Sequence, residues 1–198
     1  MAISSMKTGL IKRSLLVGNT AFSPSSYESI ATVTLGSSQS TITFSSIPAD
    51  YTHLQLRVIA QNTENVTGEG NWTMNFNSDT TITNYRSHWA RGNGSSIDAG
   101  NVQATNYYVY LGTIACSPSG QTSMFSSYTI DILDYANTNK TKVVRALGGT
   151  DLNGSGAYVG IYSSVWLSTS VITGITFRIP SGDQYRQNTQ ISLYGIKG

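Results

Sequence analysis

The chain has 198 residues, a formal net charge of +2 and 11% charged side chains, against about 25% in an average globular domain. This balance, without a dense Lys and Arg cluster, excludes a protein that neutralises many phosphates. The single Cys116 excludes an internal disulfide and a thiolate metal site. No run reaches the roughly 18 apolar residues of a transmembrane helix. We therefore expect no nucleic-acid partner, no membrane contact and no cofactor.

The first 26 residues show no strand-like alternation of apolar and polar side chains. Two interpretations are open: a frayed terminus, or an arm that docks on a shell or on a neighbouring subunit. The arm is favoured because its aliphatic side chains are costly to leave in water. Its contact residues would be Leu10, Ile11, Lys12, Arg13, Leu15, Leu16 and Val17.

From residue 27 onward, apolar residues recur at every second position. In residues 71–77, Trp72, Met74 and Phe76 alternate with polar residues, and residues 53–60 repeat the pattern. Such alternation predicts strands with one face on a core and the other face in water. Further strands are expected at 30–35, 41–44, 107–115, 128–133, 142–147, 157–167, 171–179 and 190–196, which are rich in Val, Ile, Thr, Tyr and Phe.

Short polar turns rich in Gly, Asn, Ser and Pro separate these runs, as at residues 92–94, 117–120 and 180–183. No window combines a 3.6-residue apolar period with helix caps. The sequence therefore predicts an all-β protein: an antiparallel β-sandwich of jelly-roll type, with about ten strands and an extended N-terminal arm. The expected division is an arm at 1–26 and one sandwich domain at 27–198.

Residues that could carry catalysis are few. His53 lies on the polar side of its strand, and His88 lies in an aromatic segment where packing explains it. Asp131 and Asp134 are three residues apart, so on a strand they face opposite sides and do not form a paired-carboxylate site. We therefore expect no enzyme, with no catalytic residues, no metal site and no cofactor site.

Aromatic residues allow one binding alternative. Tyr108, Tyr110 and Trp166 could form a glycan-binding face, since a tyrosine ring offers flat apolar area and a hydroxyl. The simpler interpretation places such rings in the core or in a subunit interface. Clustered carboxylates beside the rings, which would favour a sugar site, are not evident in the sequence.

Four segments resemble a known family: PSSYESIATVTLG at 24–36, ITFSSIPADYTHLQLR at 42–57, DILDYANTNK at 131–140 and LYGIKG at 193–198. They are similar to structural proteins of tailed-bacteriophage virions, many of them from phages of aquatic bacteria (cyanophage-like). The resemblance covers about residues 24–198 and consists of turns and strands. It implies a structural component of the particle and provides no catalytic residues.

Together these observations predict a non-enzymatic capsid decoration or cement protein on the virion surface, which stabilises the head. Low charge lets like subunits approach one another, and a closed ring of subunits covers exposed strand edges. The expected partners are the chain itself, as a homotrimer, and the major capsid protein. The alternative is a tail or fibre protein that binds host-surface glycans.

Overall fold

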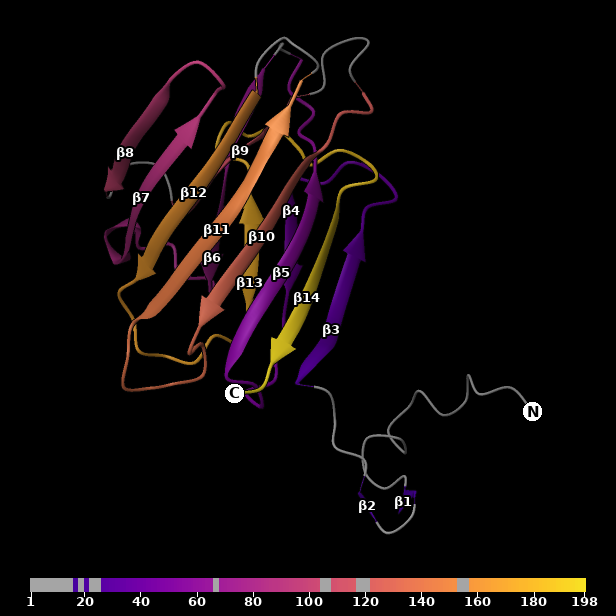
Figure 1. Cartoon of the computed structure of the whole chain (residues 1–198), viewed down its shortest axis with the longest axis vertical. Coiled ribbons are helices and arrows are strands. Elements are labelled where there is room, and N and C mark those ends of the chain that lie inside the picture. The colour runs from indigo at the N-terminus through magenta and orange to yellow at the C-terminus, as the bar shows by residue number, and fades with distance from the viewer. Residues whose placement is uncertain are drawn as a thin grey trace, which may run out of the picture.

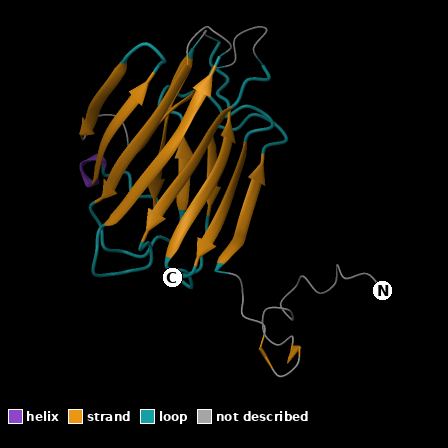
Figure 2. Ribbon diagram, viewed as in Figure 1, coloured by secondary structure: helices purple, strands orange, loops and turns teal. Residues whose placement is uncertain are grey.

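The computed structural model describes residues 16–17, 20–21, 26–65, 68–103, 108–116, 122–152 and 157–198. Within these ranges the regular structure is strand, apart from one 3-10 turn at Ile82–Asn84, and Figure 2 shows strands throughout the body of the chain. No helix in these ranges has the length and apolar character needed to cross a membrane. The predicted arm residues 10–13 and Leu15 lie outside the described residues. Leu16–Val17 forms a short strand, β1, which pairs antiparallel with β2 (Thr20–Ala21).

Twelve further strands form two antiparallel sheets (Figure 1). The large sheet contains β3 (Tyr27–Thr34), β5 (His53–Ala60), β7 (Tyr85–Gly92), β8 (Ile97–Gln103), β10 (Ser126–Leu133), β11 (Lys142–Asp151), β12 (Ala157–Trp166) and β14 (Gln190–Ile196). Its order is β3-β14-β5-β10-β11-β12-β7-β8. The small sheet contains β4 (Thr41–Phe44), β6 (Glu69–Phe76), β9 (Val109–Ala115) and β13 (Ile175–Arg178), in the order β4-β13-β6-β9.

The connections between the sheets are those of a jelly roll. Each strand of the small sheet follows and precedes a strand of the large sheet in the chain. Without the inserted hairpins, the remaining strands form four consecutive pairs, each with one strand in each layer: β3 and β4, β5 and β6, β9 and β10, and β13 and β14. These eight strands form two four-stranded layers, β3-β14-β5-β10 and β4-β13-β6-β9. The hairpins β7–β8 and β11–β12 are insertions that extend the large sheet beyond β10. The fold prediction is confirmed; the strands of the β11–β12 insertion are among those predicted, and the β7–β8 insertion is an addition.

The core lies between the layers and follows the predicted alternation. On β5, Leu54, Leu56 and Val58 are buried while the intervening side chains face outward. Trp72 from the small sheet stacks on Phe177, with ring centroids 5.8 Å apart, and meets the ring of Tyr128 edge-on at 5.1 Å. Aromatic pairs of this kind add to the free energy gained by burying their area.

The polar side of β6 differs from the expectation. Alternation predicts that Thr73 and Asn75 face water, but both are buried. Arg178 Nε donates a hydrogen bond to Asn75 Oδ1 at 3.2 Å, and Asn75 Nδ2 donates to the Asp79 carbonyl at 3.3 Å. Neighbouring groups therefore cover this part of the outer side of the small sheet and satisfy its amide.

Strand number and length also differ in places. The strands β7 and β8 are additions to the predicted set, although the predicted turn at residues 92–94 does join them. Asn93 Oδ1 organises this turn by accepting hydrogen bonds from the backbone N–H groups of Ser95 and Ser96. The expected strand at 171–179 is shorter and covers only Ile175–Arg178.

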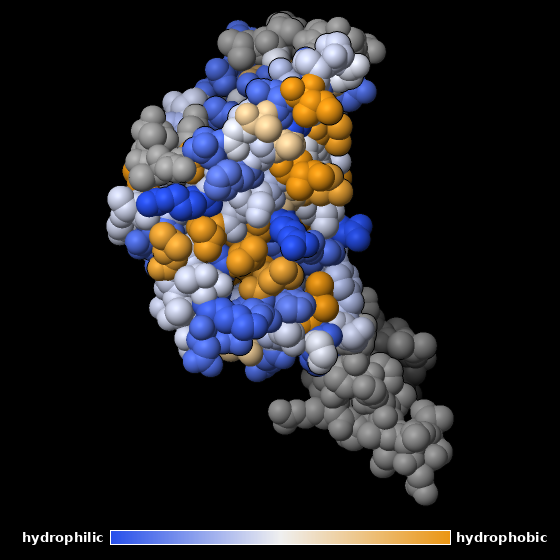
Figure 3. All heavy atoms as spheres, turned by 60° about the vertical axis from the view of Figure 1, so that its left-hand side comes forward, coloured by the Kyte–Doolittle hydropathy of each residue, from blue (hydrophilic) through white to orange (hydrophobic). Residues whose placement is uncertain are grey.

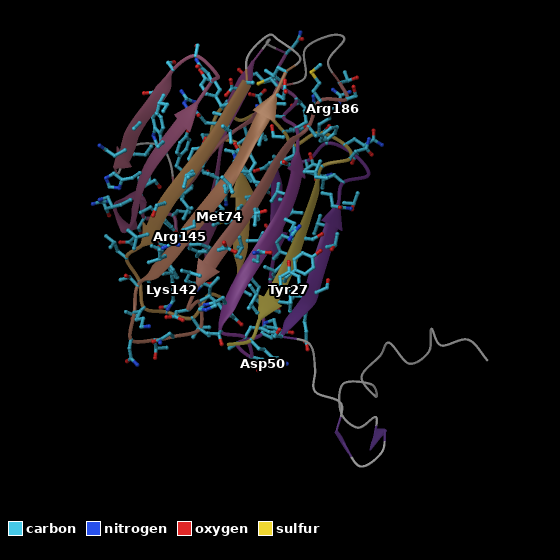
Figure 4. The ribbon with its side chains drawn as sticks, viewed as in Figure 1. Tyr27, Asp50, Met74, Lys142, Arg145 and Arg186 are labelled. Carbon is cyan, nitrogen blue, oxygen red and sulfur yellow. The ribbon has the colours of Figure 1, made fainter. Side chains whose placement is uncertain are left out.

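A buried lysine connects the β10–β11 loop with the β12–β13 loop at one end of the large sheet. The Lys142 side chain has no exposed surface, and its Nζ donates hydrogen bonds to the carbonyl oxygens of Asn137, Lys140 and Thr169 (Lys142 is labelled in Figure 4). Burial lowers the pKa of Lys142 from its ordinary value.

Asp79 anchors the connection between β6 and β7. Its carboxylate accepts hydrogen bonds from Trp166 Nε1 at 2.7 Å, from Asn84 Nδ2 at 2.8 Å and from the Thr81 backbone N–H at 2.8 Å. Burial acts to raise the pKa of Asp79, but these hydrogen bonds outweigh it and hold the pKa below 3.8. The first insertion is therefore attached to the sandwich through a carboxylate in its charged form.

Replacing Lys142 by Met is expected to lower the free energy of unfolding by about 2–4 kcal/mol, because three carbonyl oxygens lose their common donor. Urea denaturation measures the loss. The matched control is Lys140→Met, which removes an exposed ammonium paired with Asp134 and should change stability little. Equal losses in both variants would contradict the role assigned to Lys142.

Replacing Asp79 by Asn is expected to cost about 1–2 kcal/mol at pH 7, where the charged carboxylate accepts all three hydrogen bonds. Because the pKa is lower in the folded state, the stabilisation is complete above pH 4 and disappears as the pH falls through the folded-state pKa. Unfolding free energies of both proteins between pH 7 and pH 2 test this. A difference that stays constant over that range would contradict it.

Candidate functional site

The outer face of the large sheet is the most extended surface in the described part of the chain. The small sheet covers the inner face only, so the side chains of alternate positions on β5, β10, β11 and β12 point outward. Strand registers place these outward side chains in rows. One row runs Tyr194, Gln55, Asp131, Arg145 and Ser163, and the next runs Ser192, Arg57, Thr129, Leu147 and Ile161.

One half of this face, on β3, β14, β5 and β10, is polar and internally hydrogen-bonded. Tyr27 Oη donates to Gln55 Oε1 at 2.8 Å, and Gln55 Nε2 donates to Asp131 Oδ1 at 2.8 Å. The ring of Tyr27 stacks on that of Tyr194 with centroids 4.8 Å apart. Figure 4 labels Tyr27 on this half and Arg145 on the other. The polar half is therefore a connected network of side chains.

The other half, on β11, β12, β7 and β8, is called the apolar half because it carries a strip of exposed aliphatic side chains beside the outward Arg145 and Ser163. Leu147, Val159, Ile161 and Ile97 expose 55%, 64%, 62% and 86% of their surface. Leu147 pairs with Ile161 across the strands, and Gly92 pairs with both Val159 and Ile97. A groove of about 410 Å³ lies over these residues. Exposed aliphatic side chains gathered in this way are typical of an interaction surface.

A second groove, of about 550 Å³, lies over the polar half. Arg57, Ile59 and Gln190 line it on one side and Leu147 on the other. A third depression, of about 470 Å³, lies at the end of β11 and β12 beside Asn93, Asp151 and Tyr158. All three are open at the surface, and none encloses a small molecule. The outer face is thus suited to an extended partner.

The predicted glycan-binding rings do not form a face, which corrects the alternative. Tyr110 and Trp166 are in the core, with 6% and 3% of their surface exposed. Tyr108 is half-buried, with its ring centroid 5.5 Å from that of Tyr85. Trp166 packs on Phe76 and donates its N–H to Asp79. Trp166 is buried because its position on β12 faces the small sheet, and Tyr110 is buried because its position on β9 faces Tyr162 of the large sheet.

Of the histidines and carboxylates considered for catalysis, His53 and Asp134 come together, with Nδ1 3.6 Å from Oδ1, and His88 lies apart from them. His53 on β5 and His88 on β7 are four strand spacings apart in the sheet. His53 Nδ1 accepts a hydrogen bond from the Asp134 backbone N–H at 3.0 Å, and the Asp134 carboxylate binds Lys140 Nζ at 2.6 Å. The bond from Lys140 holds the pKa of Asp134 below its ordinary value. Among the described residues, no three His, Cys, Asp or Glu side chains are grouped so that they could hold a metal ion.

The cysteine is buried and takes part in local polar contacts. Cys116 Sγ lies 3.5 Å from Glu64 Oε2. Burial, with the nearby charge of Glu64 as a further cause, raises the pKa of the Cys116 thiol to about 12. The thiolate form, which is the reactive one, is therefore suppressed at neutral pH.

The apolar half of the outer face is not among the sequence predictions, although the sequence contains a signal for it. On β12, Tyr162 and Trp166 occupy the inward positions, while Val159 and Ile161 occupy the outward ones. An apolar run on both sides of a strand indicates that both sides have something to cover. The spacing of apolar residues predicts only that this segment is a strand, and the prediction does not take into account that Val159 and Ile161 make its outward side apolar as well.

Comparison with protein-family models, with curated proteins and with solved structures found no match to this chain. Any functional assignment therefore depends on the residues themselves and on the geometry of the outer face.

Replacing Trp166 by Ala is expected to lower the free energy of unfolding by about 3–5 kcal/mol, as for a core ring. Urea denaturation is the measurement. Leu167→Ala is the matched control. Leu167 is the next residue and its side chain is 48% exposed, so this substitution should lower the free energy of unfolding far less. A Trp166→Ala protein of unchanged stability would contradict the core position.

Proposed function

We propose that this chain is a non-enzymatic structural protein of a tailed-phage virion, and specifically a capsid decoration or cement protein. The observation that carries the proposal is the uncovered outer face of the eight-stranded sheet, with its strip of exposed aliphatic side chains. A protein that works through contact with other subunits needs such a surface. The resemblance of residues 24–198 to virion proteins is the reason for assigning the chain to a phage particle.

The two insertions support this proposal because they enlarge the surface without enlarging the core. The jelly-roll layers alone are four strands wide, and β11, β12, β7 and β8 double the width of one layer. Three of the most exposed aliphatic side chains, Ile97, Val159 and Ile161, lie on these added strands. The added strands thus contribute exposed aliphatic side chains through which the protein could contact other subunits.

The edges of the large sheet support association into a closed ring. Its end strands, β3 and β8, each have a pairing partner on one side only among the described strands. An open edge invites pairing with other chains, and a ring of subunits covers it. We propose a homotrimer that contacts the major capsid protein on the virion surface.

Low charge fits the same role. With 11% charged residues and a net charge of +2, repeated copies repel one another weakly at the high local density of a particle surface. Polar Ser, Thr and Asn side chains supply hydration instead.

The test is to locate the chain on purified particles of the phage that encodes it. An antibody against the chain should label the heads in electron micrographs, and light scattering of the free protein should give the mass of three copies. Labelling confined to the tail would favour a tail or fibre protein and overturn decoration. Absence of the chain from purified particles would overturn the structural role itself.

A further inference from the structure

The apolar strip on the outer face is defined by Leu147 on β11, Val159 and Ile161 on β12, and Ile97 on β8. Ala90 lies between Ile161 and β8 in the same row. The strip continues for three strand spacings, about 14 Å. Figure 3 brings the β7–β8 side of the molecule forward and shows apolar patches between polar ones there. Each strip residue would gain free energy from being covered.

The strip is too small to hold two flat sheets together by itself. Four aliphatic side chains supply a few hundred Å² at most, whereas a stable interface buries about 800 Å² on each partner. A narrow groove of this kind is better matched by an extended segment that lies along it. The occupant is therefore expected to be a short, aliphatic stretch of chain.

Residues 10–17 have that composition. Their sequence, LIKRSLLV, contains five aliphatic residues in two groups, Leu10–Ile11 and Leu15–Val17, with Lys12 and Arg13 between them. Fully extended, eight residues cover about 26 Å, which exceeds the length of the strip.

The middle of the strip on the same chain lies at the limit of reach for Leu15–Val17. From Tyr27, the middle of the strip at Ile161 lies five strand spacings across the sheet and four residues along it, or about 27 Å. Because Leu16 pairs with Ala21, only the residues between Ala21 and Tyr27 can span that distance. Six residues reach at most about 20 Å, and the pairing adds about 5 Å. Leu16 can therefore lie about 25 Å from Tyr27, slightly less than the distance from Tyr27 to Ile161.

We propose that residues 10–17 of one copy dock on the apolar strip of a neighbouring copy. The aliphatic groups of the arm cover Leu147, Val159, Ile161 and Ile97, and Lys12 and Arg13 face the polar surroundings. This inference rests on the part of the proposed function in which copies associate. It does not depend on the assignment to a phage head.

The test is a cross-link between two full-length variants, Leu15→Cys and Val159→Cys, co-expressed so that they assemble together. Mild oxidation should give a band of two chains only when both variants are present. Cys116 does not compete, because it is buried and its thiol pKa is about 12. The matched control is Ile59→Cys in place of Val159→Cys. Ile59 is 49% exposed and lies three strand spacings from Val159 in the same row, so it should not cross-link.

Three outcomes would overturn the docking. Cross-linking within one chain that carries both substitutions, at high dilution, would mean that the arm covers its own strip. Efficient dimers of Val159→Cys alone would mean that two strips face each other. Trimers without any cross-link would leave the proposed association standing and remove the arm from it, whereas a chain that stays monomeric would overturn the association as well.

A second variant tests the energetics. Ile161→Asp should raise the concentration needed for half-association about tenfold or more, because a charge replaces an aliphatic group in the covered strip. The control Ile59→Asp should leave that concentration unchanged. Thermal melting of both verifies that they fold. Equal behaviour of the two variants in association would contradict the proposal.

Discussion

A four-stranded sheet has to cover the inner face of an eight-stranded one, and this mismatch in width determines much of the structure. The edge strand β9 packs against β11, β12 and β7, so it covers strands that lie outside the jelly roll. Large rings complete the cover: Tyr162 on β12 is buried and meets Tyr110 on β9 edge-on, with centroids 5.7 Å apart. The hydrophobic core therefore extends to the added strand β12, where Tyr162 is one of its members.

Two glycines make room for this ring. Gly112 on β9 has φ of +99°, and a Cβ there would collide with the Tyr162 ring. A Cβ at Gly160, two residues before Tyr162 on the same strand, would collide with its hydroxyl end. A side chain at either position would have to displace the ring, so the close approach of β9 to β12 depends on glycine at both.

The alternation of side chains was sufficient to predict the sandwich, because most strands have one face on the core. It was not sufficient for β7, where Arg86 and His88 alternate with Ser87 and Trp89 and no side is uniformly apolar. The inner side of β7 is satisfied by hydrogen bonds instead, with Ser87 Oγ accepting from Ser164 Oγ at 2.7 Å and from the Tyr110 N–H at 3.1 Å. Whether Trp166 and Tyr110 face the core or water depends on which layer covers their strands, and pairing order is not a local property of the sequence.

The two halves of the outer face differ in whether being covered by a partner would stabilise them. On the polar half, Tyr27, Gln55 and Asp131 satisfy one another, and covering them would remove water from groups that already have partners. On the apolar half, Leu147 and Ile161 gain only if something excludes water from them. A partner that binds this face is therefore drawn to the strands added to the jelly roll. The insertions therefore supply the exposed aliphatic side chains of the outer face, while β3, β14, β5 and β10 supply its hydrogen-bonded polar half.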